Sequence, residues 1–339
     1  MVKIAVAGGA GGVGQEIIDA LVATKKHEIL VLSRRDAPSD SGSIPEGTSW
    51  IKADYTSVEQ LTQVLQGVHT VLSFVTESEG GGSPVQFNLI DASLEAGVKR
   101  FAPSEWVSSG LAHLSWYAFK DATRKYLKDL NKNKKVLEYT LFQPGYFVNY
   151  LTNPHPSMTH IPFTELPWDL NNRRWIGVEG GENARISLTT VKDLRNVVVQ
   201  AIEYEEEWPV DGGIRGDDIS MGEYLAIAEK VRGMSTLSPA RLTKIDSYFM
   251  LGGQPFAVEN RKAEDIEAGT WTTSWTPAFD HPAIPVEQRA SLAKSITGGI
   301  LLAVNANQLH VSDSWNKLLP DYQFTSIDEF LTEAWSGKP

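Results

Sequence analysis

Short apolar runs alternate with longer amphipathic segments through the first half of the chain. The apolar runs are of the kind found in strands buried on both faces, and they predict strands at 3–8, 27–35, 69–75, 98–106 and 138–147. Apolar positions at helical spacing predict helices between them, at 13–24, 57–67, 82–97 and 116–134. This alternation of strand and helix predicts an α/β fold with a doubly wound parallel sheet.

The pattern changes after Phe147. Residues 151–177 are rich in Pro, Asn and Trp and have no clear period, whereas 185–204 again reads as a strand followed by a helix. We therefore predict a main sheet domain over residues 1–150, with 185–216 returning to it. Residues 151–184 and 217–339 are predicted to form a smaller α+β C-terminal lobe.

Composition narrows the class of protein. The net charge of −11 argues against nucleic acid and anionic membrane surfaces as partners. The chain has no cysteine, which excludes disulfides, thiolate catalysis and cysteine-ligated metals. The start of the chain does not resemble a secretory signal, and no run approaches the roughly 18 apolar residues of a membrane span. The seven histidines show no metal-binding spacing. We expect a cytoplasmic enzyme without a metal, as a monomer or a homodimer.

Three glycines mark the turn between the first strand and the first helix. They follow the pattern Gly8-x-x-Gly11-x-x-Gly14 and begin where the strand ends. In this position Gly8 allows a tight turn, Gly11 lets a pyrophosphate approach the backbone, and Gly14 lets the helix pack closely on the sheet. The N-terminus of the helix then offers free N–H groups to phosphate. The context favours nucleotide binding over a flexible surface loop.

The end of the second predicted strand indicates which dinucleotide is bound. Arg34 and Arg35 stand there, followed by Asp36. Guanidinium groups suit the 2′-phosphate of NADP, whereas an acidic residue at this place holds the ribose of NAD. The pair favours NADP(H). The alternative is that both arginines are solvated and that Asp36 binds the ribose.

A family resemblance covers nearly the whole chain and is strongest over residues 1–150. The segments that carry it are, in order, "VAGGAGGVGQEI", "VLSRR", "KADYTSVEQL", "HTVLSFV", "VKRFAPSEW", "FKDATRKYL" and "LFQPGYFVNYL". They resemble the NmrA-like and isoflavone-reductase-like branch of the atypical short-chain dehydrogenases. The resemblance implies an NADP-binding Rossmann domain over 1–150, bound NADPH, and a cleft against a smaller substrate-binding lobe. It also implies a small-molecule substrate of aromatic character, although some members bind the nucleotide and regulate partners without catalysis.

The resemblance assigns roles to individual positions. The phosphate loop of the family matches the three glycines, and three further residues supply backbone beside the phosphates: Ala10, Gly12 and Val13. The arginine of the family matches Arg34. A lysine that reductases often carry about ten residues later has no counterpart, because 36–51 contains no Lys or Arg, so Arg35 becomes the second phosphate contact. The catalytic lysine of the family matches Lys120, which would contact the nicotinamide ribose and act as general acid or base.

Other candidates lie at predicted strand ends, where ligands bind in such sheets. Phe74 and Val75 would line the ribose and nicotinamide, with core packing as the alternative. Pro144 and Gly145 would contact the nicotinamide amide through backbone atoms. The candidate substrate wall, for which ordinary core packing is equally open, consists of Trp106, Tyr146, Phe147, Tyr150 and Trp168.

These observations predict an NADPH-dependent oxidoreductase that transfers hydride to an aromatic or conjugated small molecule. Lys120 favours this function over a sensor that binds NADP(H) and regulates a partner, since a sensor needs no proton donor. An NADPH-dependent tailoring enzyme of secondary metabolism, with chemistry beyond simple reduction, is a third hypothesis. Tyr117 precedes Lys120 by three residues, whereas ordinary short-chain dehydrogenases use Tyr-x-x-x-Lys, and we interpret it as a packing residue.

Overall fold

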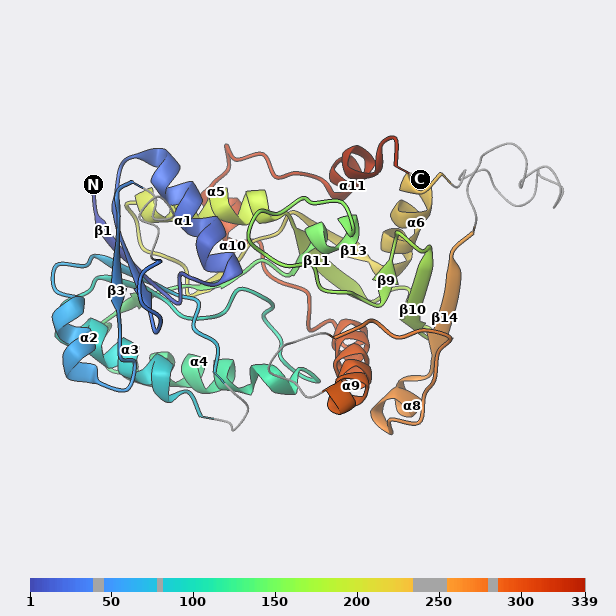
Figure 1. Cartoon of the computed structure of the whole chain (residues 1–339), viewed down its shortest axis with the longest axis horizontal. Helices are drawn as coiled ribbons and strands as arrows, with labels where there is room; N and C mark the ends of the chain where they lie inside the picture. Colours follow the sequence, from blue (N-terminus) through green and yellow to red (C-terminus); the bar gives the residue numbers. More distant parts are fainter. Residues whose placement is uncertain (39–45, 78–81, 234–254, 280–285, 339) are drawn as a thin grey trace, which may run out of the picture.

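A six-stranded sheet forms one end of the molecule (Figure 1). The computed structural model describes residues 1–38, 46–77, 82–233, 255–279 and 286–338. All pairings in this sheet are parallel, in the order β3-β2-β1-β4-β5-β6. The strands are β1 (Lys3–Ala7), β2 (Glu28–Ser33), β3 (Thr48–Lys52), β4 (Thr70–Ser73), β5 (Arg100–Ala102) and β6 (Glu138–Tyr139). The predicted α/β class with a doubly wound parallel sheet is confirmed.

Helices cover both faces of the sheet (Figure 1). They are α1 (Gly12–Thr24) and α5 (Val191–Glu203) on one face, and α2 (Val58–Val64), α3 (Pro84–Glu95) and α4 (Ala118–Leu130) on the other. Side chains of β1 alternate between the two layers: Ile4 and Val6 pack with α1 and α5, whereas Ala5 and Ala7 face the opposite core. Because both faces are covered, the strands are apolar throughout, which is why they were recognisable in the sequence.

Two parts of the sheet differ from the sequence-based expectation. Strand β3 was not predicted, because it is a half-exposed edge strand without an apolar run. The predicted strand at 138–147 is divided into β6, β7 (Leu141–Gln143) and β8 (Tyr146–Phe147). The break between β7 and β8 follows from Gly145, whose φ of +67° is in the left-handed region and interrupts an extended chain.

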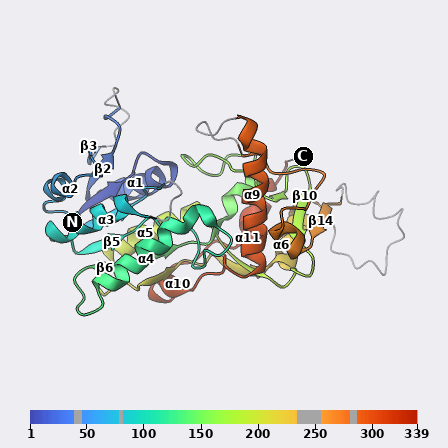
Figure 2. The ribbon, with the colours of Figure 1, turned by 90° about the horizontal axis from the view of Figure 1, so that it is seen from below.

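Three small sheets and several helices make up the rest of the described chain, and Figure 2 shows the C-terminal part beside the main sheet. The sheets are β12-β7, β13-β11-β8 and β14-β10-β9. The remaining strands are β9 (Trp168–Asp169), β10 (Arg174–Val178), β11 (Arg185–Thr189), β12 (Asp211–Gly213), β13 (Asp217–Ser220) and β14 (Ala257–Arg261). The remaining helices are α6 (Met221–Val231), α8 (Ala263–Glu267), α9 (Val286–Asn305), α10 (Ser314–Leu318) and α11 (Ile327–Trp335). Of the predicted lobe, residues 234–254, 280–285 and 339 lie outside the described part of the chain.

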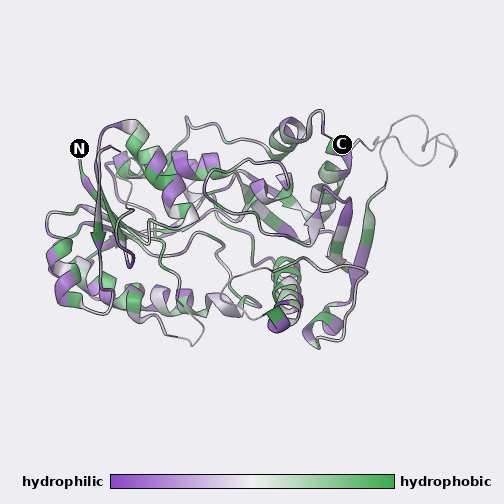
Figure 3. Cartoon of the chain, viewed as in Figure 1, coloured by the Kyte–Doolittle hydropathy of each residue, from purple (hydrophilic) through white to green (hydrophobic). Residues whose placement is uncertain are grey.

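Large aromatic side chains join the main sheet to the C-terminal segment. Phe142 stacks on Trp315 at 5.6 Å between ring centroids and meets Trp208 edge-on at 5.7 Å. All three side chains are fully buried. Figure 3 shows the hydropathy of each residue: the strands of the main sheet are largely hydrophobic, and the helices that cover it carry both hydrophobic and hydrophilic residues. In the described residues no helix is both long and apolar enough to cross a bilayer.

Candidate functional site

The turn between β1 and α1 has the geometry of a phosphate-binding loop. Gly8 has a φ of +74°, and its N–H donates to Leu32 O at 2.9 Å. A Cβ on Gly14 would lie 2.9 Å from Gly9 Cα, so glycine at this position lets α1 pack directly on the turn. Gly11 is the N-cap of α1, and within the described chain a Cβ there would meet Gly8 O alone, at 3.4 Å. The N-terminus of α1 therefore offers its N–H groups beside a position with room for a ligand.

The other predicted loop residues are Ala10, Gly12 and Val13. Gly12 lies under the segment that follows β8, because a Cβ on Gly12 would be 2.9 Å from His160 O. The buried carboxylate of Glu16, one turn into α1, accepts hydrogen bonds from the N–H groups of Thr159 at 2.6 Å and His160 at 2.8 Å. Arg195 of α5 forms an ion pair with the same carboxylate, with its Nη1 3.0 Å from Glu16 Oε2. The segment at Thr159 and His160 is thereby fixed against the glycine turn between β1 and α1.

The end of β4 lies directly beside the glycine turn. A Cβ on Gly8 would be 3.0 Å from Phe74 C and 3.1 Å from Val75 N. The ring of Phe74 stacks on Trp106 with centroids 4.3 Å apart. Trp106 has a φ of +51°, which is costly for a bulky residue, and its indole N–H donates to Ser73 O at 2.7 Å. The structure thus brings Phe74, Val75 and Trp106 to the carboxyl edge of the sheet.

The predicted 2′-phosphate contacts lie at the end of β2. Among the described residues, no side chain forms an ion pair or hydrogen bond with the guanidinium group of Arg34 or Arg35. Lys52 of β3 binds the Asp36 carboxylate at 2.9 and 3.0 Å. The acidic residue that would hold an NAD ribose is therefore paired with a cation, and a third positive group stands close to the two arginines.

Lys120 is buried on the first turn of α4, with 4% of its surface exposed. Its Nζ donates to Ser104 O and to Glu105 O, each at 2.7 Å. Burial lowers the pKa of Lys120 from its ordinary value to about 8, while the Glu105 carboxylate opposes this change and Arg124 adds to it. An ammonium group has three N–H donors, so two of them fix the amine and one is left for a ligand.

Tyrosine side chains surround the region next to Lys120. The Lys120 Nζ lies 4.7 Å from the centre of the Tyr117 ring. Burial raises the pKa of Tyr117, and it raises the pKa values of Tyr146 and Tyr150 further above their ordinary range. The rings of Tyr146 and Tyr150 meet edge-on at 6.2 Å. These phenols therefore keep their protons at neutral pH, so each has an O–H group that can donate a hydrogen bond.

Four of the five predicted wall residues are in ring contact with one another. Tyr146 meets Tyr150 and Trp168, each at 6.2 Å between ring centroids, and Phe147 meets Tyr150 at 6.1 Å. Trp106 stacks instead on Phe74 and Phe142. Phe147 and Trp168 are buried, at 6% and 2% exposure, and their rings pack in separate cores. Trp106 packs on the main sheet, whereas Tyr146 belongs to the core of the C-terminal part, and Tyr150 contacts both cores. Tyr146 and Tyr150 are half-buried, so they are the two members of the C-terminal core group best placed to meet a ligand.

Gly145 and Pro144 have a structural role at the joint between β7 and β8. The N–H of Gly145 donates to Val107 O at 2.7 Å, and a Cβ on Gly145 would lie 2.2 Å from Ser187 O. This close approach requires glycine. Because the N–H is occupied and Pro144 has none, a backbone contact to a nicotinamide amide from these two residues would have to use a carbonyl group.

The sequence did not indicate Arg124 or its ion pair with Glu105. Arg124, one turn later on α4, forms a forked ion pair with Glu105 through Nε at 3.0 Å and Nη2 at 2.5 Å. The spacing of Lys120 and Arg124 by four residues places both on one helix face, which was the available signal. Lys52 was missed because β3 was missed.

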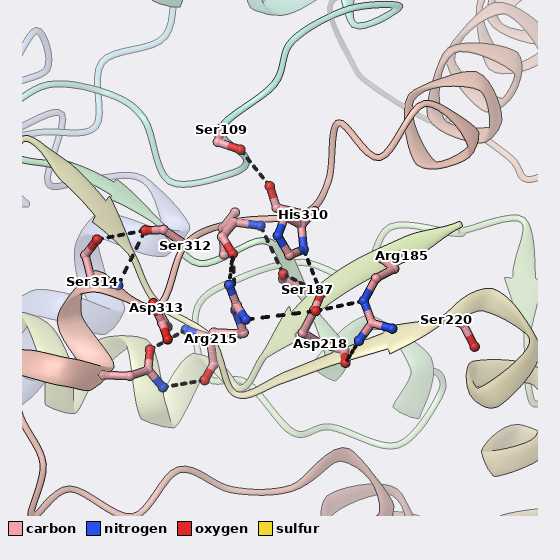
Figure 4. A network of polar contacts seen from close by, with 12 residues as sticks. Ser109, Arg185, Ser187, Arg215, Asp218, Ser220, His310, Ser312, Asp313 and Ser314 are labelled. Atoms are coloured by element: carbon pink, nitrogen blue, oxygen red, sulfur yellow. Dashed lines mark hydrogen bonds and ion pairs between the residues drawn. The ribbon is translucent and has the colours of Figure 1, made fainter. Parts of the chain in front are cut away.

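A polar network in the C-terminal part holds the loop that follows β5 (Figure 4). Asp218 of β13 binds His310 Nδ1 at 2.9 Å and Arg185 Nε at 2.9 Å, and Ser187 Oγ donates to it at 3.3 Å. The backbone carbonyl of His310 in turn accepts a hydrogen bond from Ser109 Oγ at 2.6 Å. The loop beside Lys120 is therefore anchored to the C-terminal strands.

The sequence is similar to a known family and to a curated oxidoreductase. The sequence profile of the NmrA-like family matches residues 2–238. Oxidoreductase BOA1 of Botryotinia fuckeliana is 33% identical over 241 residues, which are 69% of this chain and 77% of that protein.

Two solved structures share the fold. The NADPH-dependent quinone oxidoreductase QOR2 of Escherichia coli, in complex with NADPH, superimposes with a TM-score of 0.65 at 21% identity, over 97% of this chain and 99% of that one. AtPrR2 with NADP+ and (+)pinoresinol superimposes with a TM-score of 0.61 at 19% identity, over 98% of both chains.

Proposed function

Since this chain belongs to the NmrA-like family and is an oxidoreductase, we propose that it uses NADPH to reduce an aromatic or conjugated small molecule, with Lys120 as general acid. The observation that carries the proposal is the Lys120 amine, buried at the carboxyl edge of the sheet and held by two carbonyl groups. A protein that only senses the nucleotide has no need of such a group.

The residues present fit NADPH. Within the described residues, the Gly11 position leaves space next to the N-terminus of α1 for a pyrophosphate, and no side chain pairs with the guanidinium groups of Arg34 and Arg35, which suit a 2′-phosphate. When bound, the cofactor supplies the hydride. The similar structures of QOR2 and AtPrR2 contain NADPH and NADP+, respectively, which supports this choice of cofactor.

Replacing Arg34 with alanine is expected to weaken NADPH binding far more than NADH binding. The loss should be roughly 1.5–3 kcal/mol, the value of a hydrogen bond to a charged group. Titration calorimetry with both nucleotides measures the difference, and Lys26→Ala, whose lysine pairs with Glu203 away from the strand end, is a matched charge control. Equal losses for NADPH and NADH would contradict a 2′-phosphate contact.

Lys120 is suited to supply the proton that accompanies hydride transfer. Its pKa of about 8 leaves the amine mostly protonated at neutral pH, yet makes the ammonium a better acid than an ordinary lysine. The Ser104 and Glu105 carbonyls fix the direction of the amine. The neighbouring tyrosines keep their protons and can orient a substrate oxygen.

The rate of reduction should depend on this ionisation. Because the general acid must be protonated, kcat for reduction is expected to be highest below pH 8 and to fall as the pH rises through about 8. Steady-state rates with saturating NADPH and a conjugated acceptor, measured from pH 6 to 10, test this expectation. A flat profile over this range would remove Lys120 from the chemical step.

We further propose that residues 151–184 and 217–339 form the substrate-binding lobe, with 185–216 rejoining the NADP-binding domain. Helix α5 packs on α1, which supports the second part. Tyr146 and Tyr150, just before the start of the lobe, offer half-buried rings to an aromatic substrate. The similar AtPrR2 structure contains (+)pinoresinol together with NADP+, which supports a small-molecule ligand beside the cofactor.

A further inference from the structure

Glu105 is a buried carboxylate placed just beyond the end of β5. It is 1% exposed and accepts hydrogen bonds from Arg124 at 3.0 and 2.5 Å and from Gln143 Nε2 at 3.3 Å. A buried charge of this kind is costly unless it is paired and fully hydrogen-bonded. The forked contact with a guanidinium satisfies both oxygens and fixes their direction.

Arg124 binds the same loop at a second place. Its Nη1 donates to Ser109 O at 2.7 Å and its Nη2 donates to Ser108 O at 2.9 Å. One side chain of α4 therefore holds the Glu105 side chain at the start of the loop and the carbonyl groups three and four residues further on. The segment from Glu105 to Ser109 cannot shift without breaking these contacts.

Lys120 binds the start of this loop from the same helix. Its amine donates to the Ser104 and Glu105 carbonyls, one turn of α4 before Arg124. The position of the two carbonyl groups sets the position of the amine. Lys120 and Arg124 of α4 therefore both bind the loop that follows β5.

We propose that Glu105 and Arg124 are positioning residues for Lys120, because their ion pair fixes the loop whose carbonyl groups hold the amine. The inference rests on the proposed role of Lys120. Neither residue needs to touch substrate or cofactor. Glu105 favours the ammonium form of the lysine, whereas Arg124 favours the neutral amine.

The other groups that face Lys120 carry no charge at neutral pH. Tyr117 and Phe119 present their rings at 4.7 and 4.9 Å from Nζ, and burial raises the pKa of the Tyr117 phenol. Ser104 contributes a carbonyl. Asp121 faces Arg124 at 3.7 Å from the exposed side of α4. Within the described residues, Glu105 and Arg124 are the charged groups that act on the amine.

The test is a direct measurement of the Lys120 pKa in the full-length protein. Lysine labelled with ¹³C at Cε reports its ionisation by NMR, and the Lys120→Arg spectrum assigns the signal. Glu105→Gln is expected to lower the pKa of Lys120 and Arg124→Met to raise it, each by about 1 pH unit. A purely structural role would move both in one direction.

Ser109→Ala is the matched control. It removes the hydrogen bond to His310 O on the far side of the same loop but leaves the Ser109 carbonyl that Arg124 uses (Figure 4). It should leave the pKa of Lys120 unchanged. A change in this control as large as in the charge variants would overturn the proposal.

The double variant Glu105→Gln/Arg124→Met covers the case in which one variant fails to fold. It removes both charges together, so the pKa of Lys120 should return toward that of the parent protein. No difference among parent, single and double variants would also overturn the proposal. The NMR measurement tests the positioning role even if Lys120 takes no part in catalysis. The turnover of the Lys120→Ala variant tests the catalytic role separately. If both inferences hold, the pH midpoint of kcat moves with the NMR pKa.

Discussion

Replacing Lys120 with alanine is expected to slow the chemical step by about 10²–10⁴-fold, the usual contribution of a general acid or base. The change removes the only group on the first turn of α4 that is both buried and titratable near neutral pH, within the described chain. Single-turnover oxidation of bound NADPH by a conjugated acceptor measures this step. If Lys120 only contacted the cofactor, binding would weaken and turnover at saturating NADPH would change little.

Lys120→Arg separates positioning from proton transfer. Arginine keeps the positive charge and the hydrogen-bond donors but does not give up a proton. We expect the Arg variant to be nearly as slow as the Ala variant while retaining NADPH affinity. Normal turnover of the Arg variant would make Lys120 a positioning residue only.

Gly11→Val is expected to abolish NADPH binding while leaving the protein folded. The backbone of Gly11, at φ −86° and ψ 161°, is extended and suits valine, and a Cβ there meets only Gly8 O at 3.4 Å within the described residues. The side chain would instead occupy the approach of the pyrophosphate. Titration calorimetry with NADPH and thermal unfolding measure the two effects.

Gly14→Val is the contrasting variant. A Cβ on Gly14 would lie 2.9 Å from Gly9 Cα, so this change should lower the melting temperature as well as binding. If the Gly11→Val variant bound NADPH as tightly as the parent protein, the glycine turn would not be the phosphate-binding site.

The parallel sheet could be predicted because burial on both faces leaves continuous apolar runs at β1, β2 and β4. β3 lacked that signal because its side chains are half-exposed. The glycine turn was equally readable, since its spacing, strand and helix stand together in the sequence. Lys120 itself required a family resemblance, because a lysine in a helix is usually a solvated residue.

Contacts between distant segments could not be read from the sequence. Glu105 and Arg124 are separated by 19 residues, and nothing in their spacing indicates an ion pair. Phe147 packs in the core of the main sheet and Trp168 in the core of the C-terminal part. This arrangement depends on the pairing of β8 with β11, which the sequence does not show. Gly145 was predicted as a ligand contact, whereas its close approach to Ser187 depends on the pairing of β8 with β11.

A crystal structure of the complex with NADPH would show whether Lys120 lies at the reacting end of the cofactor. We expect the pyrophosphate at the N–H groups around Gly11 and the 2′-phosphate at Arg34 and Arg35. We expect Lys120 Nζ within hydrogen-bond distance of the nicotinamide ribose or of an acceptor above the ring. A nicotinamide bound away from Lys120, with the amine still enclosed by the Ser104 and Glu105 carbonyls, would contradict this expectation and favour a protein that binds the nucleotide without catalysis.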